Sequence, residues 1–220
     1  MRKILLATSN PGKLAEIRAM LGCDVQWVGL SDFKGIAEIE EDGRTFAENA
    51  RKKAIGYAKA TGLWTIADDS GLVIDALGGQ PGIKSARFSG AKDKNRTLLD
   101  HKNMAKVLKL LEGVPKEKRT ASFVCCLCLA CPEHVEGASP PDERRASPEK
   151  VLIETEGTLE GLIAEKEIGE NGFGYDPIFF VPGLNKTVAQ LTADEKNAIS
   201  HRGSALRKLK PFLANLLRGA

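Results

Sequence analysis

The first half of the chain alternates between short apolar runs and longer stretches with helical character. Residues 3–7 and 63–67 are short apolar runs and predict buried strands. Apolar residues recur three and four positions apart over 14–21 and 95–111, which predicts helices, and residues 45–60 are rich in strong helix formers. Strands and helices are therefore expected to interleave in this half.

The second half is richer in strands. Residues 121–131 and 151–163 predict long strands, and a Gly-rich turn near residue 173 leads into a further strand. A final helix is expected from about residue 201. We predict an α/β protein in which helices flank a mixed central sheet, with two lobes around a substrate cleft.

Residues 1–220 are predicted to form a single domain of two lobes. The polar segment 131–150 carries four prolines and is interpreted as a surface hairpin or insertion.

Two helix starts carry the capping-box signature, in which Ser or Thr is followed three positions later by Glu or Gln. They are Thr45 with Glu48, and Thr192 with Glu195. Ser200 is a candidate cap for the final helix, and Pro211 is expected to kink that helix.

The net charge of the chain argues against a typical nucleic-acid-binding protein. The 32 basic and 29 acidic residues leave a net charge of only +3, so the chain lacks the strongly basic character of many such proteins.

The apolar runs of the chain are short. No apolar run approaches the roughly 18 residues that a membrane span needs. The apolar run at the start is too short for a signal peptide, so we expect a cytoplasmic protein with reduced thiols.

Four of the five cysteines lie close together at positions 125, 126, 128 and 131. A zinc site is one interpretation, with His134 nearby. On a strand, however, Cys126 and Cys128 point one way while Cys125 and Cys131 point the other. We therefore favour buried thiols that act as small hydrophobic residues.

The segment T-S-N-P-G-K joins the first strand to the first helix. Backbone N–H groups at a helix start, together with a lysine, form an anion site. The phosphate-binding candidates are Thr8, Ser9, Asn10, Pro11, Gly12 and Lys13. The alternative is a plain turn with a surface lysine. On the next helix, Lys52 and Lys53 are either solvated cations or ligands of a phosphate.

Two acidic segments of the sequence suggest a metal-binding site. The segment E-I-E-E-D spans residues 38–42, and A-D-D-S-G follows the strand at 63–67, where we place it at the strand end. Carboxylates so arranged suit Mg²⁺, which takes oxygen ligands from protein and phosphate. The alternative is an exposed acidic loop and an aspartate that caps a turn.

The segment F-G-Y-D and three residues near the last helix carry candidate base-binding groups. Phe173 and Tyr175 either stack on a nucleobase or fill the core. The cations Lys196, His201 and Arg202 offer hydrogen-bond donors, or are simply solvated.

Taken together, six motifs resemble the inosine triphosphate pyrophosphatase family, the XTP/dITP diphosphatases that remove deaminated purine nucleotides. In order they are T-S-N-P-G-K, T-F-A-E-N-A, A-D-D-S-G-L, G-G-x-P-G-I-x-S-A-R, G-F-G-Y-D-P-I-F and S-H-R-G-x-A-L. The resemblance spans residues 3–217. Residues 131–150 depart from it, being longer and richer in proline than in bacterial members.

The resemblance implies a Mg²⁺-dependent, homodimeric enzyme that cleaves a nucleoside triphosphate to the monophosphate and pyrophosphate. Asp69 would be general base and metal ligand, and Glu41 (or Glu40) would complete the metal site. Residues 8–13 and Lys53 would hold the phosphates, and Ser70 would contact substrate. The base would contact Phe173, Gly174, Tyr175, Asp176, Lys196, His201 and Arg202.

Two rival hypotheses remain at this stage. One is a pyrophosphatase for modified pyrimidine nucleotides, and the other is a non-catalytic nucleotide- or RNA-binding module. The modest net charge and the acidic groups argue against RNA.

Overall fold

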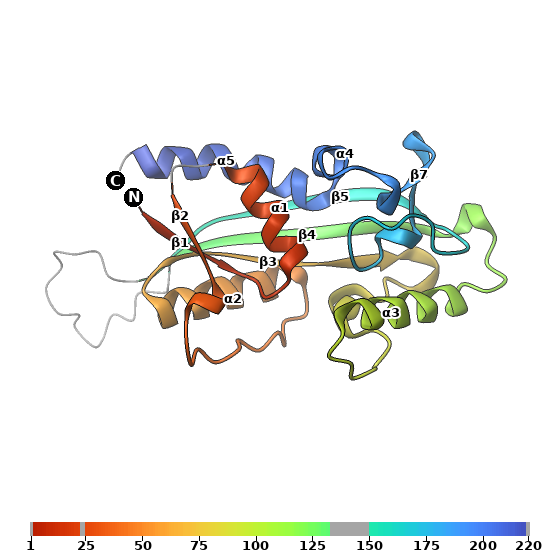
Figure 1. Ribbon diagram of the computed structural model, residues 1–220, viewed down its shortest axis with the longest axis horizontal. Coiled ribbons are helices and arrows are strands. Elements are labelled where there is room, and N and C mark those ends of the chain that lie inside the picture. Colours follow the sequence, from red (N-terminus) through yellow and green to blue (C-terminus); the bar gives the residue numbers. More distant parts are fainter. Residues whose placement is uncertain (1, 23–24, 133–149, 219–220) are drawn as a thin grey trace, which may run out of the picture. The chain divides into compact units, whose positions relative to one another are not determined.

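The computed structural model of the protein describes residues 2–22, 25–132 and 150–218. Figure 1 labels its elements. The strands are β1 (Lys3–Ala7), β2 (Gln26–Gly29), β3 (Trp64–Ile74), β4 (Thr120–Cys131), β5 (Lys150–Ile163), β6 (Phe179–Val181) and β7 (Lys186–Thr187). The helices are α1 (Pro11–Leu21), α2 (Phe46–Thr61), α3 (Arg96–Leu110), α4 (Ala193–Ile199) and α5 (His201–Arg218). The hairpin or insertion predicted at 131–150 lies, apart from its ends, outside the described residues.

These strands join one sheet in the order β2-β1-β3-β4-β5-β6-β7. Strand β1 pairs in parallel with β2 and β3, so that Ile4 lies opposite both Trp27 and Trp64. Strand β6 runs antiparallel to β5 and β7, with Phe180 opposite Leu162 and Thr187. The sheet is therefore mixed, which confirms the predicted α/β class.

The chain divides into two compact units. Unit 1 consists of residues 1–69, 126–155 and 206–220, and unit 2 consists of residues 70–125 and 156–205. Strands β3, β4 and β5 contribute residues to both. The predicted substrate cleft stays a prediction.

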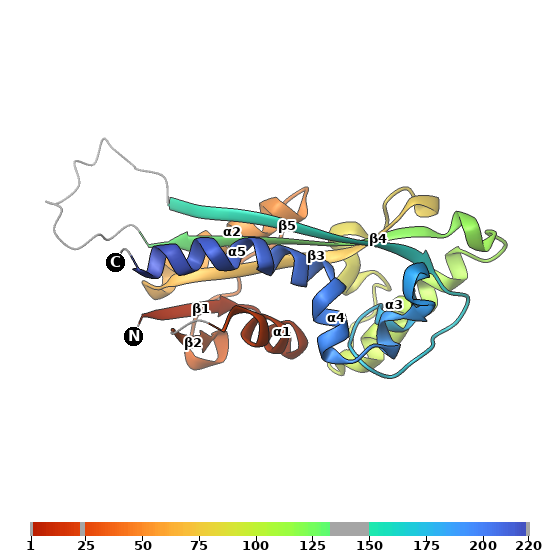
Figure 2. The same cartoon turned by 90° about the horizontal axis from the view of Figure 1, so that it is seen from above.

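In unit 1, helix α2 covers one face of the sheet, while α1 and the C-terminal part of α5 lie on the other (Figures 1 and 2). Strand β1 is buried because it lies in the interior of the sheet, and Leu5 and Leu6 are fully inaccessible. Ile17 and Leu21 pack from α1, and Ala54 packs from α2. The buried face of α2 is made largely of small side chains, Ala50, Ala54 and Ala58.

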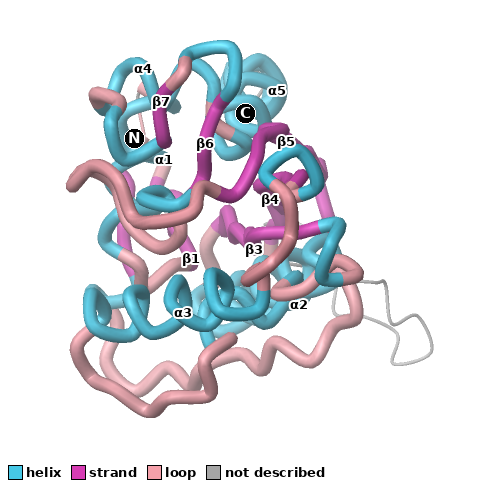
Figure 3. The backbone as a smooth tube through the Cα atoms, turned by 90° about the vertical axis from the view of Figure 1, so that its right-hand side faces the viewer, coloured by secondary structure: helices cyan, strands magenta, loops and turns pink. Residues whose placement is uncertain are grey.

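In unit 2, helices α3 and α4 lie on opposite sides of the sheet (Figure 3). Its core is a cluster of buried apolar side chains from α3, the strands and the connecting turns. The cluster comprises Leu72, Ile74, Phe88, Met104, Val107, Leu111, Ala121, Phe123, Ile163, Tyr175, Ile178, Phe179, Val181 and Val188.

The helix starts follow the predicted capping chemistry with one difference. Thr192 and Glu195 form the predicted reciprocal box at α4, and the Ser200 hydroxyl accepts from the Gly203 N–H at the start of α5. At α2, Thr45 accepts from the Glu48 N–H as predicted. The Glu48 carboxylate, however, accepts from the N–H of Arg44, one residue before the cap. Helix α5 continues through Pro211.

The sequence interpretation was wrong about where A-D-D-S-G lies. Strand β3 does not end at Ala67 but runs on to Ile74, so Asp68, Asp69 and Ser70 lie in its middle. The acidic pair looked like a strand end because buried carboxylates are costly. Here polar partners from neighbouring elements offset that cost, and the strand continues.

The described cysteines behave as small hydrophobic residues, as predicted. Cys125, Cys126 and Cys128 are buried thiols on β4, and Cys131 is a half-buried thiol at the strand end. His134 lies outside the described residues. In the part of the chain that the structure describes, no helix is both long and apolar enough to cross a membrane.

Candidate active site

The loop between β1 and α1 is organised by its own polar side chains. The Asn10 carboxamide accepts from the N–H groups of Gly12 (2.9 Å) and Lys13 (3.2 Å), which caps α1. Thr8 accepts from the Asn10 N–H at 3.2 Å. Pro11 occupies the first helical turn, where a missing N–H costs nothing. Ser9 is exposed.

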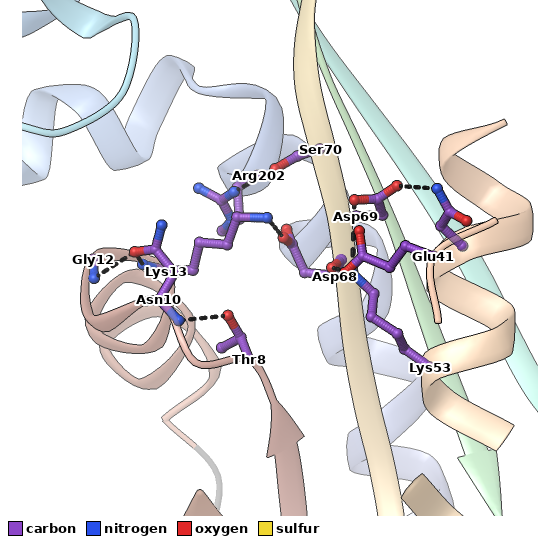
Figure 4. A network of polar contacts seen from close by, with 11 residues as sticks. Thr8, Asn10, Gly12, Lys13, Glu41, Lys53, Asp68, Asp69, Ser70 and Arg202 are labelled. Atoms are coloured by element: carbon purple, nitrogen blue, oxygen red, sulfur yellow. Dashed lines mark hydrogen bonds and ion pairs between the residues drawn. The ribbon is translucent and has the colours of Figure 1, made fainter. Parts of the chain in front are cut away.

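Lys13, in the first turn of α1, forms an ion pair with Asp68 of β3 (Figure 4). Asp68 is only 2% exposed, so it needs a cation or strong donors to remain charged. The predicted phosphate loop and the predicted acidic strand are thus joined within unit 1. The lysine itself is partly accessible, with 16% of its side chain exposed.

Lys53 of α2 connects the two acidic segments. Its ammonium group donates to Glu41 at 2.9 Å and to the backbone carbonyl of Asp68 at 2.7 Å, and lies 3.6 Å from the Asp69 carboxylate. Burial by itself lowers the pKa of Lys53, but the nearby carboxylates outweigh this effect and leave that pKa raised. Lys53 therefore stays cationic in its buried position.

The two lysines of α2, which the residue pattern alone did not distinguish, have different surroundings. Lys52 is exposed and pairs with the equally exposed Asp42. Lys53 is 8% exposed and belongs to the acidic group. Of the two glutamates considered as ligands, Glu41 contacts Lys53, whereas Glu40 is exposed.

Asp69 accepts a hydrogen bond of 3.0 Å from the side-chain amide of Asn49. Burial raises the pKa of Asp69, although Lys53 and Lys13 act in the opposite direction. A carboxylate whose pKa is raised in this way is a stronger base than one in water. Asp69 is therefore suited to accept a proton.

The carboxylate chemistry of this group suits a hard cation. Glu41 and Asp69 offer oxygen ligands, and Mg²⁺ in nucleotide enzymes commonly binds one or two carboxylates together with substrate phosphates. Within the described residues, no three His, Cys, Asp or Glu side chains are close enough to hold a metal by themselves.

In unit 2, the turn at residues 172–176 is held by its own aspartate. Asp176 accepts from the Phe173 N–H at 2.9 Å and from Lys196 at 2.5 Å. Gly172 and Gly174 have φ of 79° and 65°, conformations that other residues rarely adopt. The Lys196 ammonium lies 4.4 Å from the centre of the Phe173 ring.

The start of α5 supplies the other predicted base ligands. Arg202 is 1% exposed, donates to the Ser70 hydroxyl at 2.8 Å, and lies 5.8 Å from the Phe173 ring. His201 stacks on Phe123, with ring centres 4.9 Å apart. Tyr175 is buried in the core cluster of unit 2, as the core alternative predicted, and Phe173 is half-buried.

The predicted residues thus form two groups. Thr8, Asn10, Lys13, Glu41, Lys53 and Asp69 belong to unit 1, and Ser70, Phe173, Tyr175, Asp176, Lys196, His201 and Arg202 belong to unit 2. Ser70 directly follows Asp69 along β3.

The sequence analysis missed two polar residues that contact residues of the predicted site. Asn49 contacts Asp69, and Asp100 accepts from the Gly174 N–H at 2.9 Å. Each is a polar residue that falls on the apolar face of an amphipathic helix, and Asn49 also belongs to the motif T-F-A-E-N-A.

Comparison with known proteins gives one consistent family. A model of the Ham1 family matches residues 4–212. The dITP/XTP pyrophosphatase of Desulforamulus reducens is 45% identical over 216 residues, covering 97% of this chain and 96% of that protein. The dITP/XTP pyrophosphatase of Bacillus subtilis is 46% identical, covering 97% and 98%.

Solved structures agree with the sequence comparisons. A HAM1 protein from Coxiella burnetii matches with a TM-score of 0.78 and 42% identity, covering 98% of this chain and all of that one. The Staphylococcus aureus Ham1 protein matches with a TM-score of 0.78 and 39% identity, covering 97% and 99%.

Proposed function

Because this chain belongs to the Ham1 family, we propose that it hydrolyses deaminated purine nucleoside triphosphates such as dITP, ITP and XTP. The products are the nucleoside monophosphate and pyrophosphate. The observation that carries the chemistry is the placement of Asp69, a buried carboxylate fixed by Asn49 and close to Lys53. By removing these nucleotides, the enzyme would keep them out of DNA and RNA.

The reaction joins a water oxygen to the α-phosphorus and breaks the bond from that phosphorus to the oxygen bridging to the β-phosphorus. Asp69 accepts the proton that the water loses. Pyrophosphate departs with the bonding electron pair. Lys13 and Lys53 offset the negative charge of the phosphate oxygens. The N–H groups of Gly12 and Lys13 donate to Asn10, so α1 contributes through the positive end of its dipole.

Mg²⁺ is the cofactor we propose, with Glu41 and Asp69 as its protein ligands. When bound, it would neutralise phosphate charge. Lys53 lies beside both carboxylates and offsets part of their negative charge in the free protein. In this assignment Asp69 combines two tasks, proton acceptor and ligand.

Recognition of the base falls to residues of unit 2. The half-buried ring of Phe173, with the Lys196 ammonium over the ring, offers a surface on which a purine stacks. Donors from Lys196, His201 and Arg202 favour a carbonyl at position 6 of the purine, as in hypoxanthine and xanthine. Adenine carries an amine there and leaves such donors unpaired, a mismatch that sites reject strongly.

The remaining proposals follow from the family resemblance. The enzyme would act as a homodimer in the cytoplasm, on free nucleotides rather than on nucleic acid. The balanced charge of the chain, +3 overall, is consistent with a small-molecule substrate.

The test is pyrophosphate release by the purified protein with Mg²⁺, measured in parallel on dITP, ITP, XTP, GTP and ATP. Rapid release from the first three, with the monophosphate as the other product, is the expected result. Release from modified pyrimidine triphosphates instead would favour the pyrimidine alternative. A folded protein that binds nucleotides without turnover would overturn the assignment as an enzyme.

A further inference from the structure

The turn that carries Phe173 is attached to the body of unit 2 through its backbone. Gly174 donates its N–H to the Oδ2 atom of Asp100, a residue 74 positions away on α3. Asp100 is buried, with 7% of its surface exposed. A buried carboxylate that accepts a backbone N–H is a strong acceptor, so this contact constrains the turn.

Each oxygen of Asp100 has its own partner. While Oδ2 receives the Gly174 N–H, Oδ1 lies 3.1 Å from the Arg96 Nε, one helical turn earlier on α3. The Arg96 side chain is half exposed. Arg96 therefore compensates part of the carboxylate charge, while the contact to the turn is made by the carboxylate alone.

A second attachment lies one residue further along the same turn. The Tyr175 hydroxyl donates to the backbone carbonyl of Ser85 at 2.8 Å. The Ser85 hydroxyl in turn donates to the Gly82 carbonyl and accepts from the Leu72 N–H. Burial, followed by the charge of Asp100, raises the pKa of Tyr175, so its hydroxyl remains a donor.

These contacts give a role to a motif that the proposed mechanism leaves unused. Gly82 and Ser85 belong to G-G-x-P-G-I-x-S-A-R, whose residues 82–87 form a short 3-10 helix. Helix α3 holds Gly174 through Asp100, and the motif holds the next residue, Tyr175, through Ser85. Phe173 precedes both, and its own N–H is fixed by Asp176.

We propose that Asp100 is a positioning residue for the base: by fixing Gly174 it sets the plane of the Phe173 ring on which the purine stacks. This inference rests on the proposed function. Asp100 touches neither phosphate nor the reacting water in this assignment. Its loss should therefore weaken binding of the base while leaving the chemical step nearly unchanged.

The experiment compares Asp100→Ala with Asp100→Asn, which retains an acceptor for the Gly174 N–H. Steady-state kcat and KM on dITP are measured with Mg²⁺, and the affinity for dIMP is measured by calorimetry without metal. The matched controls are Asp93→Ala, which removes a partly exposed carboxylate just before α3 that pairs with Lys102, and Arg96→Gln, which removes only the ion pair. Thermal unfolding of each variant reports on the fold.

We expect Asp100→Ala to raise KM and to weaken dIMP binding about tenfold, the loss of one hydrogen bond to a charged acceptor, with kcat changed less than threefold. Asp100→Asn should restore most of the affinity for dIMP and most of the KM for dITP. The two control variants should behave as wild type. Wild-type affinity in Asp100→Ala, or a fall in kcat without a change in dIMP affinity, would overturn the inference. If the wild-type enzyme releases no pyrophosphate from dITP, the proposed function itself fails, and this inference fails with it.

Discussion

The side chain of Asn49 holds Asp69 on one side and the loop that carries Glu41 on the other. Its amide nitrogen donates to Asp69 Oδ2 at 3.0 Å, and its oxygen accepts from the Gly43 N–H at 2.8 Å. Asn49 is fully buried. Because one neighbour only accepts and the other only donates, the amide has a single orientation.

Replacing Asn49 with Ala should lower both stability and activity. The change leaves the Gly43 N–H and the Asp69 carboxylate without this partner, and each buried group left unsatisfied costs about 1–3 kcal/mol. We expect the free energy of unfolding to fall by about 2 kcal/mol, and kcat to fall about tenfold or more as Asp69 loses its fixed orientation. Urea unfolding and pyrophosphate release measure the two effects.

The Asn49→Asp variant separates the two hydrogen bonds. It keeps an acceptor for Gly43 but places a second carboxylate beside Asp69, so kcat should fall at least as far as in Asn49→Ala. Full activity in Asn49→Asp would show that Asp69 does not depend on this donor.

Asp69→Asn should abolish turnover without unfolding the protein. The amide has nearly the same shape but cannot accept the proton of the attacking water, and loss of a general base typically costs 10²–10⁴-fold in rate. Pyrophosphate release on dITP measures the rate, and circular dichroism confirms the fold. A rate close to that of the wild type would remove Asp69 from the mechanism.

How far the sequence could predict this structure depended on whether the signal was local. Strand β1, the cap of α2 and the capping box of α4 were predictable, because apolar runs and capping residues act on their own neighbours. The continuation of β3 through Asp68 and Asp69 was not predictable in this way. It depends on Lys13 and Lys53, which lie 55 and 15 or more positions away along the chain.

The same limit applies to the candidate site. The resemblance pointed to Lys53 and Asp69, whereas the residue pattern alone did not distinguish Lys52 from Lys53, because that distinction depends on the orientation of α2. Asn49 and Asp100 were missed because each acts through one long-range contact, to Asp69 and to Gly174 respectively. A polar residue on the apolar face of a helix indicates that it has a partner, but the sequence does not show which residue that partner is.

The adjacent lysines of α2 allow a matched pair of substitutions. Lys53→Ala leaves Asp69 and Glu41 without their buried cation, and breaking such a group typically costs about 3–5 kcal/mol. It should therefore destabilise the protein strongly and reduce turnover. Lys52→Ala removes an exposed ion pair with Asp42, which contributes little in water. Unfolding curves of the two variants should differ clearly, and equal curves would contradict the assigned role of Lys53.

Gly157 allows β5 to approach the start of α5 closely. A Cβ atom at this position would lie 2.1 Å from the His201 carbonyl oxygen and 2.6 Å from the Ala205 nitrogen, both backbone atoms. Gly157→Ala should therefore displace α5 at His201 and destabilise the protein by about 1–3 kcal/mol. At Gly183 an added Cβ meets nothing within 4 Å, so Gly183→Ala should be neutral. Thermal unfolding tests both, and a stable Gly157→Ala protein would show that this contact relaxes freely.

The thiol of Cys128 should resist alkylation at a pH where ordinary cysteines react. Burial, with a smaller contribution from Glu154, raises the pKa of Cys128 from 9.0 to about 12. Because the thiolate is the reactive form, the folded protein should keep Cys128 unmodified by iodoacetamide at pH 8.5, and unfolding in guanidinium should expose it. Mass spectrometry of the digested protein reads out this site by itself.

The same shift in pKa predicts how stability changes with pH. The unfolded thiol ionises above about pH 9, whereas the folded thiol stays neutral up to about 12. The contribution of Cys128 to folding is therefore complete below pH 9 and declines as the pH rises toward 12, by at most about 1.4 kcal/mol per pH unit. Cys128→Ala should show a shallower loss of stability between pH 9 and 11 than the wild type. Equal slopes for the two proteins, or ready alkylation of Cys128 in the folded state, would contradict a buried and neutral thiol.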